Sequence, residues 1–125
     1  MSDLINWFEI PVNDFDRAET FYNGLFEIEL ERTVLNDATY GNFPRTSRSR
    51  NQVGGAIVKG GQNNPSSTGT IVYFDVTGEM EAVLNRAERL GGKIEVNRTL
   101  IDVNRGYFAL IHDSEGNRVG LFSEE

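Results

Sequence analysis

The chain has 125 residues, and its 12 basic and 19 acidic side chains give a net charge of −7 and a pI near 4.7. This length predicts a single domain, and the acidic excess disfavours nucleic acid and membrane surfaces as partners. The sequence contains no cysteine, which excludes disulfides, zinc–thiolate sites and cysteine nucleophiles. Because we see no apolar run of about 18 residues and no signal peptide, we expect a cytoplasmic protein.

The first half of the chain predicts a strand, a helix and three further strands. Residues 4–12 alternate like a half-buried strand, and Asn13 or Asp14 can cap the helix that follows. The apolar face of this helix consists of Phe15, Ala18, Tyr22 and Leu25. The three further strands are expected at about 27–34, 38–44 and 52–59.

The second half predicts the same order of elements. Residues 70–76 form a strand, Thr77 or Gly78 caps a helix, and Gly91-Gly92 ends it. The apolar face of this helix consists of Met80, Val83, Leu84, Ala87 and Leu90. Its strands are expected at about 93–98, 106–112 and 117–122. The polar segment 60–69 is the predicted linker between a first module at about 4–59 and a second at about 70–123.

An internal repeat supports this division. Ile28-Glu29-Leu30 recurs as Ile94-Glu95-Val96, and Val53-Gly54 recurs as Val119-Gly120, at the same spacing along the chain. We therefore predict an α+β fold of two tandem β-α-β-β-β modules. Because one helix covers only one face of each sheet, edge-to-edge pairing of the modules would give a cup-shaped mixed sheet with both helices on its convex side.

Alternation along the strands identifies the side chains that face into the cup. The candidate ligand contacts on this concave face are Trp7, Glu9, Gln52, Gly54, Ile71, Tyr73, Asp75, Arg118, Gly120 and Phe122. They combine aromatic surface with a few polar groups, which suits a small organic molecule, including a planar one.

Two motifs carry a resemblance to a known family. The opening Trp7-Phe8-Glu9-Ile10-Pro11-Val12, with Asp14, Arg17-Ala18 and Phe21-Tyr22 after it, resembles that of the glyoxalase/bleomycin-resistance/dioxygenase (vicinal oxygen chelate) superfamily. Asp113 with Gly116-Asn117-Arg118 resembles the family's closing hairpin, so the resemblance runs from Leu4 to Phe122. It implies a cup of paired modules, often in a homodimer. In metal-using members, a divalent ion in the cup polarises adjacent substrate oxygens.

The resemblance also implies where metal ligands would stand, and this chain departs from the pattern at each place. The ligand positions fall on Trp7, Ile71 and Gly120, and Gly54 is the repeat partner of the last. None of these side chains can bind a divalent cation, and carboxylates at Glu9 and Asp75 alone would make a weak site. We expect no metal or other cofactor, and neither glyoxalase I nor extradiol dioxygenase activity.

Several candidate residues keep two interpretations. Glu9 either pairs with Arg118 or, unpaired against Trp7, has a raised pKa and acts as a general acid or base. Trp7 either fills the metal position as packing or stacks on a ligand. Asp75 is expected near the solvated rim.

Two further features lie outside the predicted cup. His112, the sole histidine, is expected to be a hydrogen-bonded structural residue rather than a proton shuttle. The Arg45, Arg48 and Arg50 cluster is expected to be a solvated loop, with anion capture at the rim as the alternative.

Three functions remain open from the sequence. The first is binding of a small molecule in a metal-free cup by a homodimer. The second is a lyase or isomerase that uses Glu9 as its acid–base residue, with Arg118 or Tyr73 stabilising an oxyanion. The third is a structural or regulatory dimer with no dedicated ligand. The sequence does not identify the ligand.

Overall fold

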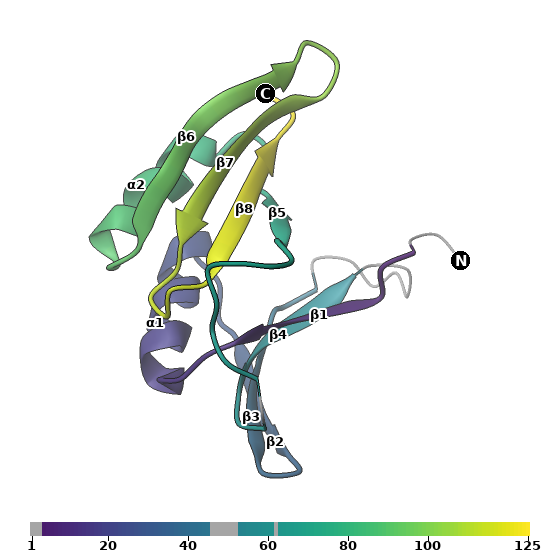
Figure 1. Cartoon of the computed structure of the whole chain (residues 1–125), viewed down its shortest axis with the longest axis vertical. Helices are drawn as coiled ribbons and strands as arrows, with labels where there is room; N and C mark the ends of the chain where they lie inside the picture. The colour runs from purple at the N-terminus through teal and green to yellow at the C-terminus, as the bar shows by residue number, and fades with distance from the viewer. Residues whose placement is uncertain (1–3, 46–52, 62) are drawn as a thin grey trace.

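The computed structural model describes residues 4–45, 53–61 and 63–125 (Figure 1). The elements of the first half are β1 (Trp7–Pro11), α1 (Phe15–Phe26), β2 (Glu31–Leu35), β3 (Ala38–Asn42) and β4 (Gly54–Lys59). Those of the second half are β5 (Tyr73–Asp75), α2 (Met80–Arg89), β6 (Lys93–Asp102), β7 (Gly106–His112) and β8 (Arg118–Ser123). The predicted α+β class and the order of elements in both modules are confirmed.

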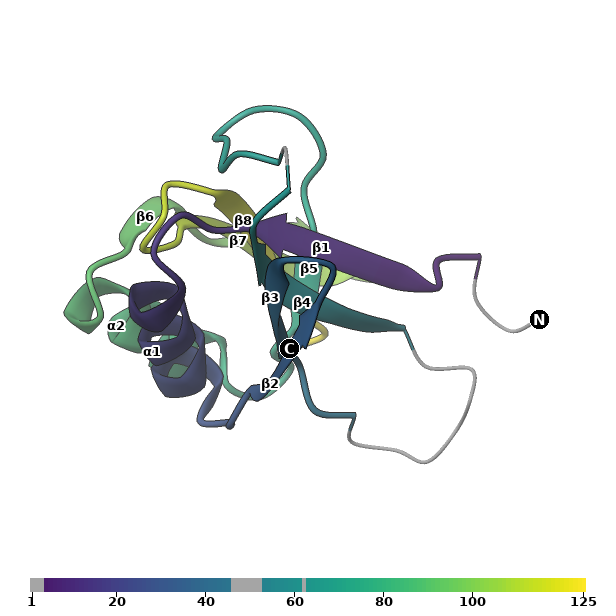
Figure 2. The same cartoon turned by 90° about the horizontal axis from the view of Figure 1, so that it is seen from below.

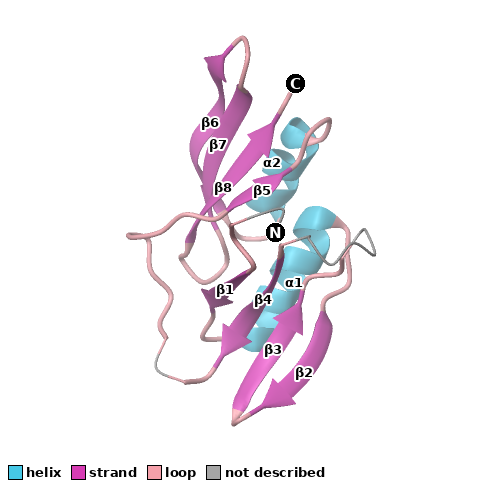
Figure 3. Ribbon diagram, turned by 90° about the vertical axis from the view of Figure 1, so that its right-hand side faces the viewer, coloured by secondary structure: helices cyan, strands magenta, loops and turns pink. Residues whose placement is uncertain are grey.

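The two modules have the same sheet topology. Strands run in the order β1-β4-β3-β2 in one sheet and β5-β8-β7-β6 in the other, with one parallel and two antiparallel pairings in each. Trp7 is opposite Gly54 and Tyr73 is opposite Gly120, so the registers repeat at the same spacing as the sequence. The expected hydrogen-bonded pairing between modules is not found: the described strands form two separate sheets (Figure 3).

Several strand boundaries differ from the predicted ones. β5 has only three residues, pairs with β8 alone and meets no strand at its other edge among the described residues. β2 begins at Glu31 rather than at 27, because Glu27 caps α1 in the left-handed conformation (φ 54°). β6 continues to Asp102, beyond the predicted end at 98. Its pairing with β7 has three register shifts, each of which takes up extra residues, so the two strands stay paired over a longer range.

The helix starts differ in their capping. Asp14 caps α1 as predicted, accepting a hydrogen bond from the Arg17 N–H at 3.1 Å. The prediction that Thr77 or Gly78 caps α2 is wrong, since α2 is preceded by Glu79 without a side-chain cap. The Thr77 hydroxyl is already used, because it donates to Asp75.

One hydrophobic core joins the two modules. The two helices lie side by side (Figure 2). The core contains Phe15, Ala18, Phe21, Tyr22 and Leu25 from α1, Met80, Val83, Leu84 and Ala87 from α2, and Ile10, Ile57, Ala109, Ile111, Val119 and Leu121 from the strands. Since residues of both modules contribute, neither half buries this core alone.

The turn between β7 and β8 fastens the second module to the start of α1. Buried Asp113 accepts hydrogen bonds from the backbone N–H of Asn117 at 2.9 Å and from the Tyr22 hydroxyl at 2.6 Å. Burial, followed by the charge of Asp113, raises the pKa of Tyr22 well above its usual value, so the phenol remains a donor. The Asn117 amide also donates to the Pro11 carbonyl at 2.8 Å.

Glu115 completes this attachment. Its side chain is 1% exposed and accepts from the backbone N–H groups of Asn13 and Asp14 at 3.0 and 2.8 Å. Its other oxygen accepts from Arg17 Nε at 2.7 Å. Burial by itself raises the pKa of Glu115, but the hydrogen bonds from Arg17, Asp14 and Asn13 outweigh it and the pKa is lowered. The ionised carboxylate therefore stabilises the fold, and this contribution disappears as the pH falls through the lowered pKa.

We predict that Glu115→Gln lowers the free energy of unfolding by about 1–3 kcal/mol at neutral pH, because a charge-assisted set of hydrogen bonds is lost. The difference from the parent protein should shrink in acid, where the parent carboxylate is also protonated. Urea denaturation at several pH values measures both effects. Glu88→Gln, an exposed change on α2, is the control, and equal stability of the two variants would contradict the role of Glu115.

Candidate functional site

A cavity of about 760 Å³ lies between β1 and β5. Its lining residues are Ile5, Trp7, Phe8, Glu9, Val53 and residues 70–75. We call it the cup cavity. It brings together five of the predicted site residues: Trp7, Glu9, Ile71, Tyr73 and Asp75. Each edge strand supplies an aromatic side chain and, two residues later on the same face, a carboxylate.

The aromatic rings of the cup cavity pack on glycines of the neighbouring strands. The Tyr73 ring lies over Gly120, where a Cβ would collide with it. A Cβ on Gly54 would lie 3.0 Å from Cζ3 of Trp7 and 2.7 Å from an Arg45 guanidinium nitrogen. Both rings remain partly open to solvent, with Trp7 41% and Tyr73 49% exposed. Gly54 and Gly120, two of the predicted site residues, therefore lie beneath the rings and are not among the lining residues of the cup cavity.

The carboxylates of the cup cavity are held by residues two positions away in the sequence. Glu9 accepts a hydrogen bond from the Trp7 indole N–H at 3.2 Å. Asp75 accepts from the backbone N–H and the hydroxyl of Thr77, at 3.0 and 2.6 Å. Both carboxylate side chains are on exposed residues, in agreement with the rim position expected for Asp75.

Of the two interpretations of Glu9, pairing with Arg118 is not found among the described ion pairs. Arg118 donates instead to both oxygens of Glu95, through Nε at 3.1 Å and Nη2 at 2.8 Å. His112 Nε2 lies 2.7 Å from the same carboxylate. The hydrogen bonds from Arg118 and then His112 lower the pKa of Glu95. His112 is thus hydrogen-bonded, as expected for a structural histidine.

The other predicted site residues lie around the cup cavity or outside the described part. Phe122 is half-buried in β8, opposite Asp75 in the sheet register. Gln52, Arg48 and Arg50 fall outside the described residues, so their predicted positions are not described.

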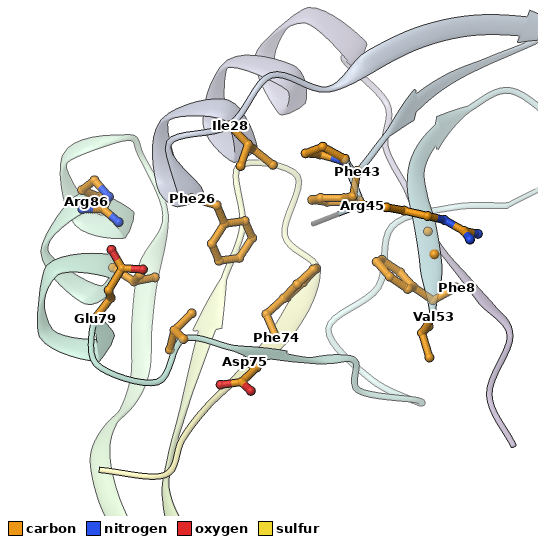
Figure 4. Close-up of a pocket in the computed structure, with 15 residues that line it drawn as sticks. Phe8, Phe26, Ile28, Phe43, Arg45, Val53, Phe74, Asp75, Glu79 and Arg86 are labelled. Carbon is orange, nitrogen blue, oxygen red and sulfur yellow. The ribbon is translucent and has the colours of Figure 1, made fainter. Parts of the chain in front are cut away.

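Sequence reasoning missed a second cavity of about 450 Å³ (Figure 4). Its apolar wall includes Phe8, Phe26, Ile28, Phe43 and Phe74, and its polar lining residues are Arg45, Asp75, Glu79 and Arg86. Phe8, Val53, Phe74 and Asp75 line both cavities. The sequence did contain a signal for this second cavity. Phe8 and Phe74 occupy equivalent positions in the internal repeat, and alternation places both on the helix-facing side of their edge strands.

The sequence profile of the Glyoxalase/Bleomycin resistance protein/Dioxygenase superfamily matches residues 4–121. The chain belongs to this superfamily. Its closing hairpin and the opening of β1 and α1, which carry the resemblance in the sequence, are the segments joined by Asp113 and Glu115 in the structure. No curated protein matches the chain in a direct comparison.

Solved structures of the superfamily share this fold at low sequence identity. A glyoxalase/bleomycin resistance protein from Albidiferax ferrireducens T118 has a TM-score of 0.69 and 16% identity, over 98% of this chain and 100% of that one. FosX, a fosfomycin resistance protein from Mesorhizobium loti, has a TM-score of 0.63 and 13% identity, over 98% and 92%. A glyoxalase I variant from Zea mays has a TM-score of 0.70 and 21% identity, over 95% of this chain and 46% of that one. The chain thus spans about half of the maize enzyme.

The superfamily's metal does not fit the residues present. The ligand positions implied by the resemblance hold Trp7, Gly54, Ile71 and Gly120, and the indole and phenol rings cover the two glycines. Within 4–45, 53–61 and 63–125, no three His, Cys, Asp or Glu side chains gather into a group that could hold a metal ion. We derive no chemical step through a metal. Separately, no helix of the described chain is long and apolar enough to cross a membrane.

We predict that the packing of the Tyr73 ring on Gly120 makes the effects of substitutions at the two positions on the free energy of unfolding non-additive. Gly120→Ala alone should destabilise by about 1–3 kcal/mol, because the new methyl group forces the ring to move. In a Tyr73→Ala background the same change should cost much less. A double-mutant cycle by chemical denaturation tests this, and additive effects would show that the Tyr73 ring does not pack on Gly120.

Proposed function

We propose that the protein binds a small planar organic molecule in the cup cavity without a divalent metal. The observation that carries this proposal is the pair of half-exposed rings, Trp7 and Tyr73, on the two edge strands that line one cavity. Ligand sites are commonly apolar hollows of about 300–1,000 Å³ with a few placed polar groups. The cup cavity has this size and character.

The backing glycines support binding rather than simple packing. One face of Tyr73 rests on Gly120, and Trp7 is in contact with Gly54. A ring whose position is fixed in this way loses little conformational freedom when a ligand stacks on it. Packing alone would bury both rings, yet each keeps two-fifths or more of its surface exposed.

A lyase or isomerase is the second candidate, favoured by the position of Glu9 in the cavity wall beside the indole. In this mechanism Glu9 exchanges a proton with the bound substrate. Tyr73 is the better oxyanion donor, because Arg118 is committed to Glu95. Turnover of a bound compound that Glu9→Gln abolishes, with affinity retained, would favour the enzyme over the binding protein.

A structural dimer without a ligand is less well supported, since Trp7 and Phe122 leave a cavity beside β1 rather than filling it. The homodimer itself stays part of the proposal. Val34, Leu35, Leu100 and Val103, near the tips of the β2–β3 and β6–β7 hairpins, expose apolar surface that a second copy could cover.

We predict that naphthalene methanol, a neutral planar probe, binds saturably and shifts the indole N–H resonance of Trp7. The chain has one tryptophan, so this resonance reports on the cup cavity without ambiguity. Tyr73→Ala should weaken binding at least several-fold, because stacking on one wall is lost. Glu88→Gln, an exposed change on α2 outside the cavity lining, is the control and should bind normally. Absence of any shift would contradict the proposal.

We also predict that protein purified without chelators contains far less than one divalent ion per chain. The reason is that the positions implied for metal ligands hold a tryptophan, an isoleucine and two glycines, and none of these side chains can bind a divalent cation. Elemental analysis by mass spectrometry measures the ratio. One equivalent of zinc, nickel or iron that survives dialysis would overturn the metal-free site.

A further inference from the structure

We infer that the cup cavity selects an organic cation, a conclusion that rests on the proposed function and names the charge class of its ligand. The two walls repeat one arrangement, in which an aromatic ring is followed by a carboxylate: Trp7 with Glu9, and Tyr73 with Asp75. The remaining lining residues are apolar apart from Thr70, and none is Lys, Arg or His.

The carboxylates of the cavity have no basic partner among the described residues. Neither Glu9 nor Asp75 is within ion-pair distance of a described Lys, Arg or His. Their hydrogen bonds come from the Trp7 indole and from Thr77, which are neutral donors. Among the described residues, no cation therefore competes with a ligand for the negative charge of the cavity walls.

The nearby arginines do not reverse this charge. Arg118 is held on both oxygens of Glu95, at 2.8 and 3.1 Å, which neutralises it locally. The guanidinium of Arg45 approaches Gly54, near the six-membered ring of the indole, whereas Glu9 holds the indole N–H. Arg45 lines the second cavity and is not among the lining residues of the cup cavity.

The aromatic rings favour the same sign of charge. The face of an aromatic ring carries negative charge density and attracts a cation placed over it, most strongly in Trp. Stacking alone would accept a neutral or an anionic plane as well. The two carboxylates supply the discrimination, because an anion in this cavity would meet two like charges and no positive partner in its lining. The net charge of −7 further favours the approach of cations.

Three planar probes of similar shape and different charge test the inference: N-methylquinolinium, naphthalene methanol and naphthoate. Titration calorimetry at low salt should give at least tenfold tighter binding of N-methylquinolinium than of naphthalene methanol, and the weakest binding for naphthoate. The preference should shrink as salt is added, because the carboxylates are exposed.

Two double variants, each of which removes two negative charges, test whether the preference for the cation comes from the carboxylates of the cavity. Glu9→Gln with Asp75→Asn should reduce the preference for the cation to about twofold to fivefold, the share that the rings alone supply, and leave binding of naphthalene methanol within about twofold. The amide introduced by Asp75→Asn keeps the oxygen that Thr77 needs, so the local fold is retained. Glu88→Gln with Asp37→Asn changes the net charge equally at exposed positions outside the cavity lining and should behave like the parent.

The outcomes separate this inference from the proposed function. Equal binding of all three probes, or preference for naphthoate, overturns the charge selectivity and leaves the planar ligand site standing. Saturable binding of none of them contradicts the site itself, and the inference fails with it. Loss of naphthalene methanol binding in the Glu9 and Asp75 double variant, with an unchanged melting temperature, would also overturn the inference.

Discussion

The fold depends on the polar attachment of the 113–117 turn to the first module. The two sheets share no strand pairing among the described residues, so the modules are joined by the common core, by this turn and by Arg86, which donates to the Leu25 carbonyl at 2.9 Å. Burial of Asp113 and the Glu115 side chain is tolerated because backbone and side-chain donors surround both carboxylates. This attachment holds the end of β1 and the start of α1 against the second module.

Repetition explains why the site is nearly symmetric. Trp7, Glu9 and Gly54 each have a counterpart in the second module that occupies the same place in its sheet. A duplicated module thus produces a cavity with two similar walls from one short pattern. The charge pair of Arg118 and Glu95 breaks the symmetry, because it is formed within the second module only.

Alternation and helical periodicity were sufficient to predict the modules and the faces of most strands, because both depend on neighbours in sequence. Ile10, Val12 and Val76 are buried as their pattern required. The relation between the sheets could not be predicted in this way, since edge pairing depends on how the helices pack. The partner of Arg118 was missed for a similar reason: alternation assigns a face, whereas the register shifts in β6 decide which carboxylate lies nearby. The α2 cap was missed because Asp75 competes for Thr77.

The packing of the two rings on Gly54 and Gly120 also limits how such a cavity could change in evolution. A carboxylate introduced at Gly120 would meet the ring of Tyr73, and an imidazole introduced at residue 7 would leave Gly54 without its cover. Single substitutions toward a metal-binding cup would therefore disturb packing before they could supply a complete set of ligands. Divergence of this chain toward metal chemistry would therefore require paired replacements on both walls of the cup cavity.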